Sequence, residues 1–344
     1  MTPRSEEELD EHLSEPRAAT IAALAGVPGD IVVLGAGGKM GPTLARMARR
    51  ALDGSGGTAA CRVIAVSRFQ GSSGNAEAAL RSAGVETLHC DLLDRRAVAD
   101  LPDAPNVVFM AGQKFGTLEA PSRTWMMNVV VPAICAERDA GARTVVFSTG
   151  NVYALTPVAT GGARESGPTG PVGEYAASCL GRERVFEHHA RNSGSRVAMM
   201  RLNYAIEPRY GVLADIASSV AAGRAIPLAM GHVNVIWQRD ANRAALELLP
   251  HASSPPTIVN VTGSSTLSVR ELAVGFGRRL RREPCFEGAE APDALLSNTE
   301  RMQALLGAPE MEIERMLDRV AEWVRAGGRL LGKPTHFEAR DGTF

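Results

Sequence analysis

Short apolar runs that alternate with helical stretches constrain the fold of this chain more than any other feature of its sequence. The run at residues 31–34, IVVL, is the clearest of them. Successive apolar positions are typical of a strand that is buried on both faces of a sheet. Strands that alternate with helices at this spacing predict a parallel sheet with helices on both sides. We therefore expect a doubly wound α/β fold.

The same patterns predict the individual elements and the division of the chain. Strands are predicted at residues 31–34, 62–66, 87–90, 106–110, 144–148, 196–201, 234–237 and 258–261. Helices are predicted at residues 5–13, 16–25, 42–52, 76–83, 95–99, 125–140, 174–192, 212–223, 239–249, 268–280, 298–306 and 312–326. We expect an N-terminal helical extension (1–29), a main α/β domain (30–203), a smaller C-terminal α/β lobe (204–328) and a tail (329–344). The lobe and the domain should interleave around residues 234–262.

Composition excludes several classes of protein. The net charge of −1 provides no field that would attract nucleic acid or an anionic membrane. No apolar run approaches the roughly 18 residues that span a bilayer, and the acidic N-terminus lacks the apolar core of a signal peptide. The five cysteines are scattered and form no CxxC pair, which disfavours a disulfide framework or a metal site. These features predict a soluble cytoplasmic protein with no metal, no nucleic-acid partner and no membrane partner.

A glycine-rich loop, GAGGKMG at residues 35–41, joins the first strand to the next helix. Gly35 allows a sharp turn, Gly38 allows the backbone to approach a pyrophosphate, and Gly41 allows close packing of the helix on the sheet. The phosphates would lie at the positive end of the helix. The loop therefore predicts a dinucleotide site, to which Lys39 and Met40 also belong. It makes residues 30–203 a dinucleotide-binding domain of Rossmann type, and we expect residues 204–328 to be the substrate-binding lobe.

The end of the second strand bears on the choice of cofactor. Ser67 and Arg68 stand where an NAD-selective site places an acidic residue for the ribose 2′-hydroxyl. Arg68 is instead suited to a 2′-phosphate, and Lys39 is able to assist it. We expect NAD(P) as the cofactor, with NADP slightly favoured.

Further motifs follow the loop in order. They are DLLD at 91–94, MAG at 110–112, VVFSTGNVY at 145–153, PVGEY at 171–175, RLN at 201–203, VIWQRD at 235–240 and NVTG at 260–263. Over roughly residues 30–328 the chain resembles the extended short-chain dehydrogenase/reductase superfamily, of the NAD(P)-dependent epimerase/dehydratase family. The resemblance implies cofactor contacts from Asp91, Leu92, Ala111, Gly112, Asn128, Tyr175 and Asn203 in addition to the loop residues.

The resemblance also implies an activity. It places Thr149 at the reacting oxygen of the substrate and makes Tyr175 the acid and base there, while Arg209 and Tyr210 fall where family members bind substrate. It implies an oxidoreductase or epimerase/dehydratase acting on a hydroxyl-bearing small molecule such as a sugar, sugar acid or nucleotide sugar. Members commonly form homodimers through the two helices beside the active site, here 125–140 and 174–192.

One departure from the family pattern concerns the residue four positions after Tyr175. The family places a lysine there, which holds the nicotinamide ribose and lowers the pKa of the tyrosine. Here that position is Cys179, which offers no charge. An unassisted tyrosine with a pKa of about 10 is phenolate in only about one molecule in a thousand at neutral pH.

Three explanations of this departure stay open. Another cation substitutes, for which Lys114 is the candidate and is therefore included among the catalytic residues with Tyr175 and Thr149. Alternatively, Tyr175 remains protonated and acts as an acid or hydrogen-bond donor. In the third case the protein binds dinucleotide without turnover, as a catalytically silent sensor or scaffold. Lysine is rare in this chain, since only Lys39, Lys114 and Lys333 occur among 37 basic residues.

Overall fold

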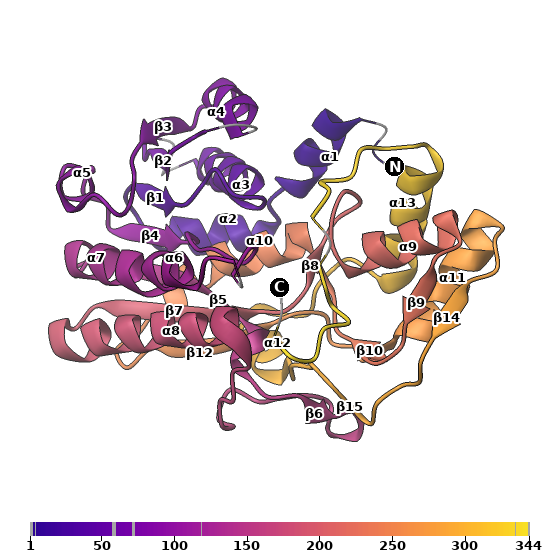
Figure 1. Cartoon of the computed structure of the whole chain (residues 1–344). Coiled ribbons are helices and arrows are strands. Elements are labelled where there is room, and N and C mark those ends of the chain that lie inside the picture. Colours follow the sequence, from indigo (N-terminus) through magenta and orange to yellow (C-terminus); the bar gives the residue numbers. More distant parts are fainter. Residues whose placement is uncertain are drawn as a thin grey trace.

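A central parallel sheet organises the structure, a computed structural model that describes residue 3 and residues 5–56, 60–70, 73–117, 119–333 and 335–342 (Figure 1). Its strand order is β12-β7-β5-β4-β1-β2-β3, and every pair in it is parallel. The strands are β1 (Ile31–Leu34), β2 (Val63–Ser67), β3 (Glu86–His89), β4 (Asn106–Phe109), β5 (Arg143–Thr149), β7 (Arg196–Leu202) and β12 (Thr257–Val261). The predicted Rossmann-type α/β fold is confirmed.

Helices cover both faces of the sheet, because alternate side chains of each strand point to opposite sides. Ile31 and Val33 of β1 join one apolar cluster, and Val32 and Leu34 join another. The first face is covered mainly by α2 (Ala18–Ala25), α3 (Gly41–Gly54), α4 (Ser73–Ser82) and α10 (Gln238–Glu247). The second is covered by α5 (Arg95–Ala99), α7 (Val131–Arg138) and α8 (Gly173–Ser193).

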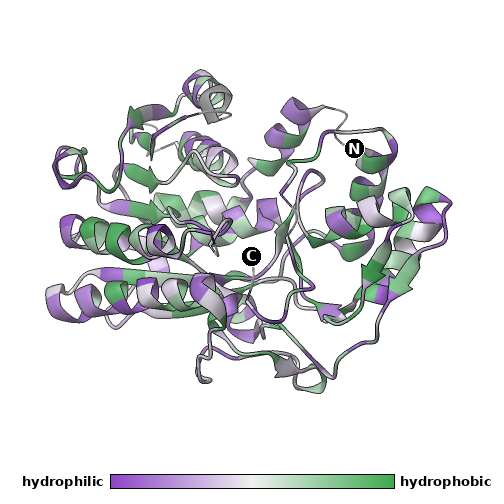
Figure 2. Cartoon of the chain, viewed as in Figure 1, coloured by the Kyte–Doolittle hydropathy of each residue, from purple (hydrophilic) through white to green (hydrophobic). Residues whose placement is uncertain are grey.

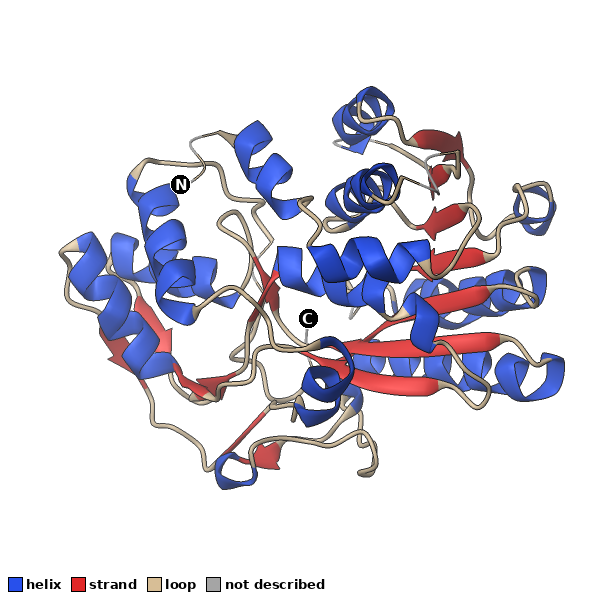
Figure 3. Ribbon diagram, turned by 180° about the vertical axis from the view of Figure 1, so that it is seen from behind, coloured by secondary structure: helices blue, strands red, loops and turns tan. Residues whose placement is uncertain are grey.

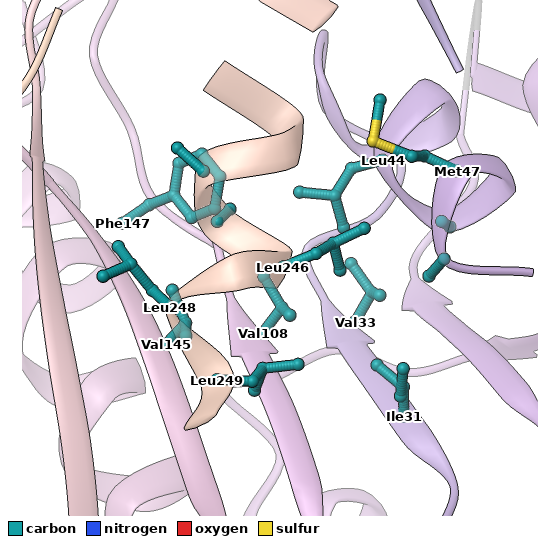
Figure 4. Packing of buried hydrophobic residues seen from close by; sticks show 14 of the residues in the cluster. Ile31, Val33, Leu44, Met47, Val108, Val145, Phe147, Leu246, Leu248 and Leu249 are labelled. Atoms are coloured by element: carbon teal, nitrogen blue, oxygen red, sulfur yellow. The ribbon is translucent and has the colours of Figure 1, made fainter. Parts of the chain in front are cut away.

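Packing on the first face shows how the apolar runs stabilise this arrangement. Figure 4 shows Leu246 and Leu249, from α10 and the turn after it, lying against Val33 and Val108 of the sheet, with Leu44 of α3 beside them. All five side chains are fully buried. Burial of such a side chain contributes about 1.5–3 kcal/mol to folding. Figure 2 shows the same pattern along the chain, with apolar residues concentrated in the sheet.

The second lobe is a layer of helices with short strand pairs, visible from behind in Figure 3. Its helices α9 (Val212–Ala222), α11 (Val269–Leu280) and α13 (Ile313–Arg325) share one apolar cluster with the fully buried Trp237. Its strand pairs are β9 (Ala225–Pro227) with β14 (Cys285–Glu287), β10 (His232–Val233) with β13 (Leu267–Ser268), and β8 (Ala205–Ile206) with β11 (Ile236–Trp237). The remaining elements are β6 (Thr156–Pro157), β15 (Asp293–Ala294) and α12 (Glu300–Leu306).

The first helices of the chain connect the two halves of the molecule. Leu9 and Leu13 of α1 (Glu6–Leu13) belong to the apolar cluster of the second lobe. Leu24 of α2 belongs to the cluster beneath the sheet. The N-terminal segment is therefore packed into both cores.

Two predicted elements differ from the structure by more than a shift of their ends by up to three residues. The strand predicted at 234–237 is reduced to β11, because both polar groups of the Asn234 side chain bond to loops, to Ser265 O and from Ser297 N. The helix predicted at 125–140 begins earlier, as α6 (Pro121–Trp125), passes through a π-helical turn at Met126–Val130, and ends with α7 at Arg138. Among the described residues, no helix has the length and apolar character needed to cross a bilayer.

Candidate functional site

The glycine-rich loop has the close contacts that its sequence predicted. Gly35 adopts φ +91°, and a Cβ atom there would lie 2.6 Å from the backbone nitrogen of Ala111. A Cβ atom on Gly41 would lie 2.3 Å from Ala36 O. Only glycine fits at either position, and the loop lies at the carboxyl edge where the strand order reverses between β1 and β4, the place where ligands bind in such sheets.

A cleft of about 290 Å³ opens beside this loop, between the sheet and the second lobe. It brings together nine of the residues predicted from the sequence. These are Gly35, Gly38, Lys39, Met40, Gly112, Lys114, Thr149, Tyr175 and Asn203. Residues from five separate stretches of the chain therefore meet at one site.

Apart from Tyr210, which is described below, the other predicted residues lie around this cleft and do not line it. Ser67 ends β2, the exposed Arg68 follows it, and Asp91 and Leu92 follow β3. Ala111 and Gly41 form the packed wall behind the loop. Asn128 is fully buried, but its Oδ1 accepts a hydrogen bond from the backbone of Gln113, which lines the cleft.

Tyr175 enters the cleft from the first turn of α8 and is half-buried. Thr149 ends β5, and its hydroxyl accepts from Asn151 N (3.2 Å) and donates to Asn151 Oδ1 (3.1 Å). Burial raises the pKa of Tyr175 well above its usual value, while the charge of Arg182 and the hydrogen bond with Thr149 act in the opposite direction. The phenol is therefore a proton donor unless a positive charge stabilises its anion.

Cys179 lies one helical turn after Tyr175 and is fully buried. Burial raises the pKa of its thiol. The thiol is therefore neutral, and it packs against Val152 and Tyr153 as a small apolar group.

Two of the three lysines, Lys39 and Lys114, line this cleft, and the third, Lys333, lies near Lys114 on the same phenylalanine ring. The Nζ of Lys39 donates to Ala205 O (3.2 Å) and lies 4.0 Å from the centre of the Tyr210 ring. The Nζ atoms of Lys114 and Lys333 lie 5.6 Å and 6.0 Å from the centre of the Phe115 ring. Burial lowers the pKa of Lys39 to about 7 and that of Lys114 to about 8.

Sequence reasoning missed Arg182, which also lines the cleft. Its Nη1 donates to Phe147 O (2.7 Å) and its Nη2 to Asn128 Oδ1 (2.8 Å). The missed signal is its spacing, since seven residues are two turns of helix and bring Arg182 to the face that carries Tyr175.

A buried ion pair joins α8 to the central sheet. Arg201 of β7 donates to Glu183 through Nε (2.9 Å) and Nη2 (2.6 Å), and Ser148 Oγ adds a third bond (2.6 Å). Arg201 Nη1 also donates to the hydroxyl of Tyr153 (2.7 Å), which donates to Asn260 Oδ1 (2.8 Å). The network fixes the helix that carries Tyr175 to the sheet.

Of the two residues that the resemblance placed at the substrate, only Tyr210 lines the cleft. Arg209 pairs with Glu207 and, through Nη2, with Asp10 (2.7 Å) and so connects the second lobe to α1.

Residues 335–342, which the sequence placed in the tail, pack against the site. Thr335 lines the cleft, and its backbone nitrogen and hydroxyl both donate to Asp215 of α9 (2.9 and 2.6 Å). At the other end, a Cβ atom on Gly342 would lie 2.2 Å from the carbonyl oxygen of Val172, at the start of α8. Figure 1 shows this segment in yellow between the lobes. It connects the second lobe to the helix that carries Tyr175.

Metal ligands do not cluster in the part of the chain that the structure describes, where no group of three or more His, Cys, Asp or Glu side chains is placed to hold an ion.

Several solved structures share this architecture. UDP-glucose 4-epimerase from Thermotoga maritima, solved with UDP-glucose, has a TM-score of 0.69 at 19% identity, covering 87% of this chain and 99% of that one. UDP-glucuronic acid 4-epimerase from Bacillus cereus, in complex with NAD, has a TM-score of 0.70 at 14% identity (86% and 99% covered). dTDP-glucose 4,6-dehydratase from Streptomyces venezuelae, with NAD and TYD bound, has a TM-score of 0.72 at 21% identity (86% and 97% covered). At these identities the likeness establishes the fold.

The sequence itself identifies the family. No curated protein sequence matches the chain. The profile of the NAD dependent epimerase/dehydratase family, however, matches residues 31–262, from β1 to just beyond β12. This chain belongs to the NAD-dependent epimerase/dehydratase family.

Proposed function

We propose that the chain is an NAD(P)-dependent oxidoreductase or epimerase/dehydratase that acts on a hydroxyl-bearing substrate such as a sugar, sugar acid or nucleotide sugar. One observation carries the proposal: a single cleft holds both the glycine-rich loop and the Tyr175–Thr149 pair. The loop supplies a place for a pyrophosphate and the pair supplies a place for a hydroxyl group that is losing or gaining a proton.

The loop fits a dinucleotide. Gly35 and Gly41 hold it close to Ala111 and Ala36, so that the exposed Gly38 faces open space at the start of α3. The backbone N–H groups and the positive end of a helix of 14 residues favour phosphate there. When bound, the nicotinamide ring would exchange a hydride with a carbinol carbon of the substrate.

The residues of this chain handle the accompanying proton. Tyr175 is placed to donate a proton to the substrate oxygen or to accept one from it, and Thr149 is placed to hold the same oxygen by a hydrogen bond. Lys114 lies on the cleft wall formed by the loop after β4. At pH values below its pKa of about 8, it adds positive charge to the cleft in which the substrate oxygen would react.

Charge in the cleft supports an anionic substrate. Lys39, Lys114 and Arg182 line it, and no carboxylate does so among the described residues. A cleft lined by charges of one sign attracts ligands of the opposite charge. Sugar acids and nucleotide sugars both carry that charge, and the similar structures solved with UDP-glucose or with NAD and TYD are consistent with the second class.

The test combines binding with turnover. NAD⁺ and NADP⁺ are titrated calorimetrically, and UDP-glucose, UDP-glucuronic acid and dTDP-glucose are then incubated with the protein and the tighter cofactor, with products followed by NMR. We expect conversion of at least one sugar, reduced about 100- to 10,000-fold by Tyr175→Phe. Binding of a cofactor without conversion of any sugar, or of simple polyols, would favour the silent sensor instead.

We further propose that NADP⁺ binds more tightly than NAD⁺, because the exposed Arg68 directly follows β2, where a 2′-phosphate would lie. Arg68→Ala should then lower the affinity for NADP⁺ by roughly 10-fold and leave that for NAD⁺ unchanged, as expected for loss of one charge-assisted contact. Equal affinities of the wild type for the two cofactors would contradict this preference.

We also propose a cytoplasmic homodimer that forms through α6, α7 and α8. Trp125 and Met126 are 40% and 42% exposed on this surface, beside α8. Exposed large apolar side chains of this kind are typical of an interface. Light scattering of the wild type should give twice the mass of the chain, and Trp125→Glu should give the monomer. A wild-type protein of monomeric mass would exclude the dimer.

A further inference from the structure

Three residues of α8 share the face that points toward the cleft. Tyr175 and Arg182 line the cleft, and Cys179, fully buried, lies between them along the helix. Spacings of four and seven residues bring side chains of one helix into the same row. The uncharged Cys179 is therefore followed, on the same face of α8, by the guanidinium group of Arg182.

We propose that Arg182 is the positioning cation of this active site. It lies one helical turn beyond Cys179 on α8 and supplies to Tyr175 the positive charge that Cys179 does not supply. The inference rests on the proposed function, because it assigns the group that makes the Tyr175 phenol acidic enough for proton exchange.

Neutral partners hold the Arg182 guanidinium in place. It is 6% exposed, and its two bonded acceptors are the Phe147 carbonyl and the Asn128 amide oxygen. Its Nε is buried with no hydrogen-bond partner in the described chain, and no carboxylate pairs with Arg182 there. Arginine keeps its charge even when buried. The positive charge is thus not neutralised by a neighbouring anion and remains available to one that forms in the cleft.

The adjacent carboxylate does not compensate this charge. Glu183 already accepts two bonds from Arg201 and one from Ser148, on the side of α8 that faces the sheet. A buried cation without a counter-ion is costly unless an anion approaches it at some stage. Tyr175 as phenolate is one such anion.

Gly112 brings the guanidinium close to the surface of the cleft. A Cβ atom at this position would lie 2.4 Å from Arg182 Nη2 and 2.9 Å from Asn128 Oδ1, so any other residue would displace one of them. Gly112 is exposed and itself lines the cleft. The absence of a side chain therefore leaves only backbone between the guanidinium and the site.

Several charged or titratable groups face Tyr175. Cys179 and Arg182 lie on its own helix, Lys114 lies on the loop after β4, Lys39 lies on the glycine-rich loop, and the paired Glu183 and Arg201 lie below. Of the charges that act on Tyr175, Arg182 is the one that most opposes the rise in its pKa. At Cys179, too, Arg182 lowers the pKa of the thiol more than Lys114 does. Lys114 also loses its charge as the pH rises past about 8, and Arg182 does not.

The test reads the ionisation of Tyr175 directly. The chain has four tyrosines, so protein labelled with carbon-13 at the tyrosine Cζ gives a spectrum in which Tyr175 is assigned by Tyr175→Phe. The label is titrated with pH, without cofactor and with saturating NAD⁺. With NAD⁺ bound we expect Tyr175 to titrate below the other three tyrosines, and Arg182→Gln to raise its pKa by about one pH unit or more. Arg182→Lys should restore at least half of that difference, which loss of structural hydrogen bonds alone would not do.

The matched control is Lys114→Met, which removes the cation of the opposite wall and keeps the length of the side chain. We expect it to raise the pKa of Tyr175 by less than half as much. A folded Arg182→Gln variant with an unchanged Tyr175 titration, or a larger rise in Lys114→Met, would overturn the inference. If Arg182→Gln does not fold, Arg182→Lys and Lys114→Met decide between the two cations. A wild-type protein that binds neither NAD⁺ nor NADP⁺ contradicts the proposed function instead, and the effect of Arg182 on Tyr175 is then measured without cofactor.

Discussion

Placing a lysine at position 179 is the most informative single change, because it restores the family pattern and should nevertheless damage this protein. Cys179 is fully buried and in contact with a small apolar cluster that contains Val152 and Tyr153. A larger side chain there costs about 1–3 kcal/mol through overpacking. Repulsion from Arg182, three residues further on, is equivalent to about 1–2 pKa units of the new ammonium group, or roughly 1.5–3 kcal/mol. Together these effects lower the free energy of unfolding by about 2.5–6 kcal/mol.

Thermal melting measures this cost, because each kcal/mol lowers the Tm of a domain of this size by roughly 2 °C. Cys179→Lys should therefore melt roughly 5–12 °C below the wild type and show no gain in turnover. Cys179→Ala is the control for loss of the thiol alone. The double variant Cys179→Lys/Arg182→Ala should melt above the value expected from the two single variants, because it removes the repulsion. A Cys179→Lys variant that melts within about 2 °C of the wild type and gains activity would refute the reasoning and favour the silent sensor.

Three other properties of the structure lead to predictions. Burial lowers the pKa values of Lys39 and Lys114 to about 7 and about 8, below the 10.5 of an ordinary lysine, so the unfolded chain binds more protons than the folded protein between these values. The free energy of unfolding should therefore rise from about pH 7 to about pH 10, and Lys39→Met should reduce this slope in urea denaturation measured across that range. Glu183→Gln leaves Arg201 as an uncompensated buried cation and should lower the free energy of unfolding by about 3–5 kcal/mol. The control Glu187→Gln breaks half-exposed ion pairs on the same helix and should lower it by less than about 1 kcal/mol. Equal Tm values for the two variants would contradict the role of the buried pair. Gly342 has φ +77° and no room for a Cβ atom. Gly342→Val should therefore release residues 335–342 and make them more sensitive to limited proteolysis than in the wild type. Equal cleavage rates would show that the close packing of Gly342 is not needed to hold this segment.

The parts of the fold that the sequence predicted are those decided by local pattern. The apolar runs predicted the inner strands of the sheet because a strand buried on both faces needs apolar residues at nearly every position, as in Ile31–Leu34. Gly35 and Gly41 were predictable for a similar reason, since their backbone contacts admit no other residue. The cleft residues Thr149 and Tyr175 followed from the family resemblance.

The rest of the site depends on contacts between distant segments. Arg182 enters the cleft only because Gly112, 70 positions earlier, leaves space for its guanidinium. Thr335 reaches the cleft because Asp215 holds it from α9. The strand predicted at 234–237 was shortened by bonds of Asn234 to Ser265 and Ser297, which no local pattern contains. Such pairings are properties of the tertiary structure.

The central claim, that a nicotinamide dinucleotide lies in the cleft with its reactive ring against Tyr175, is tested most directly by nuclear Overhauser effects in the NAD⁺ complex. Protein with protonated tyrosine rings in a deuterated background should show effects between the nicotinamide protons and one tyrosine ring, and these should disappear in Tyr175→Leu. Binding of NAD⁺ without any contact between the nicotinamide and the ring of Tyr175 would contradict the account.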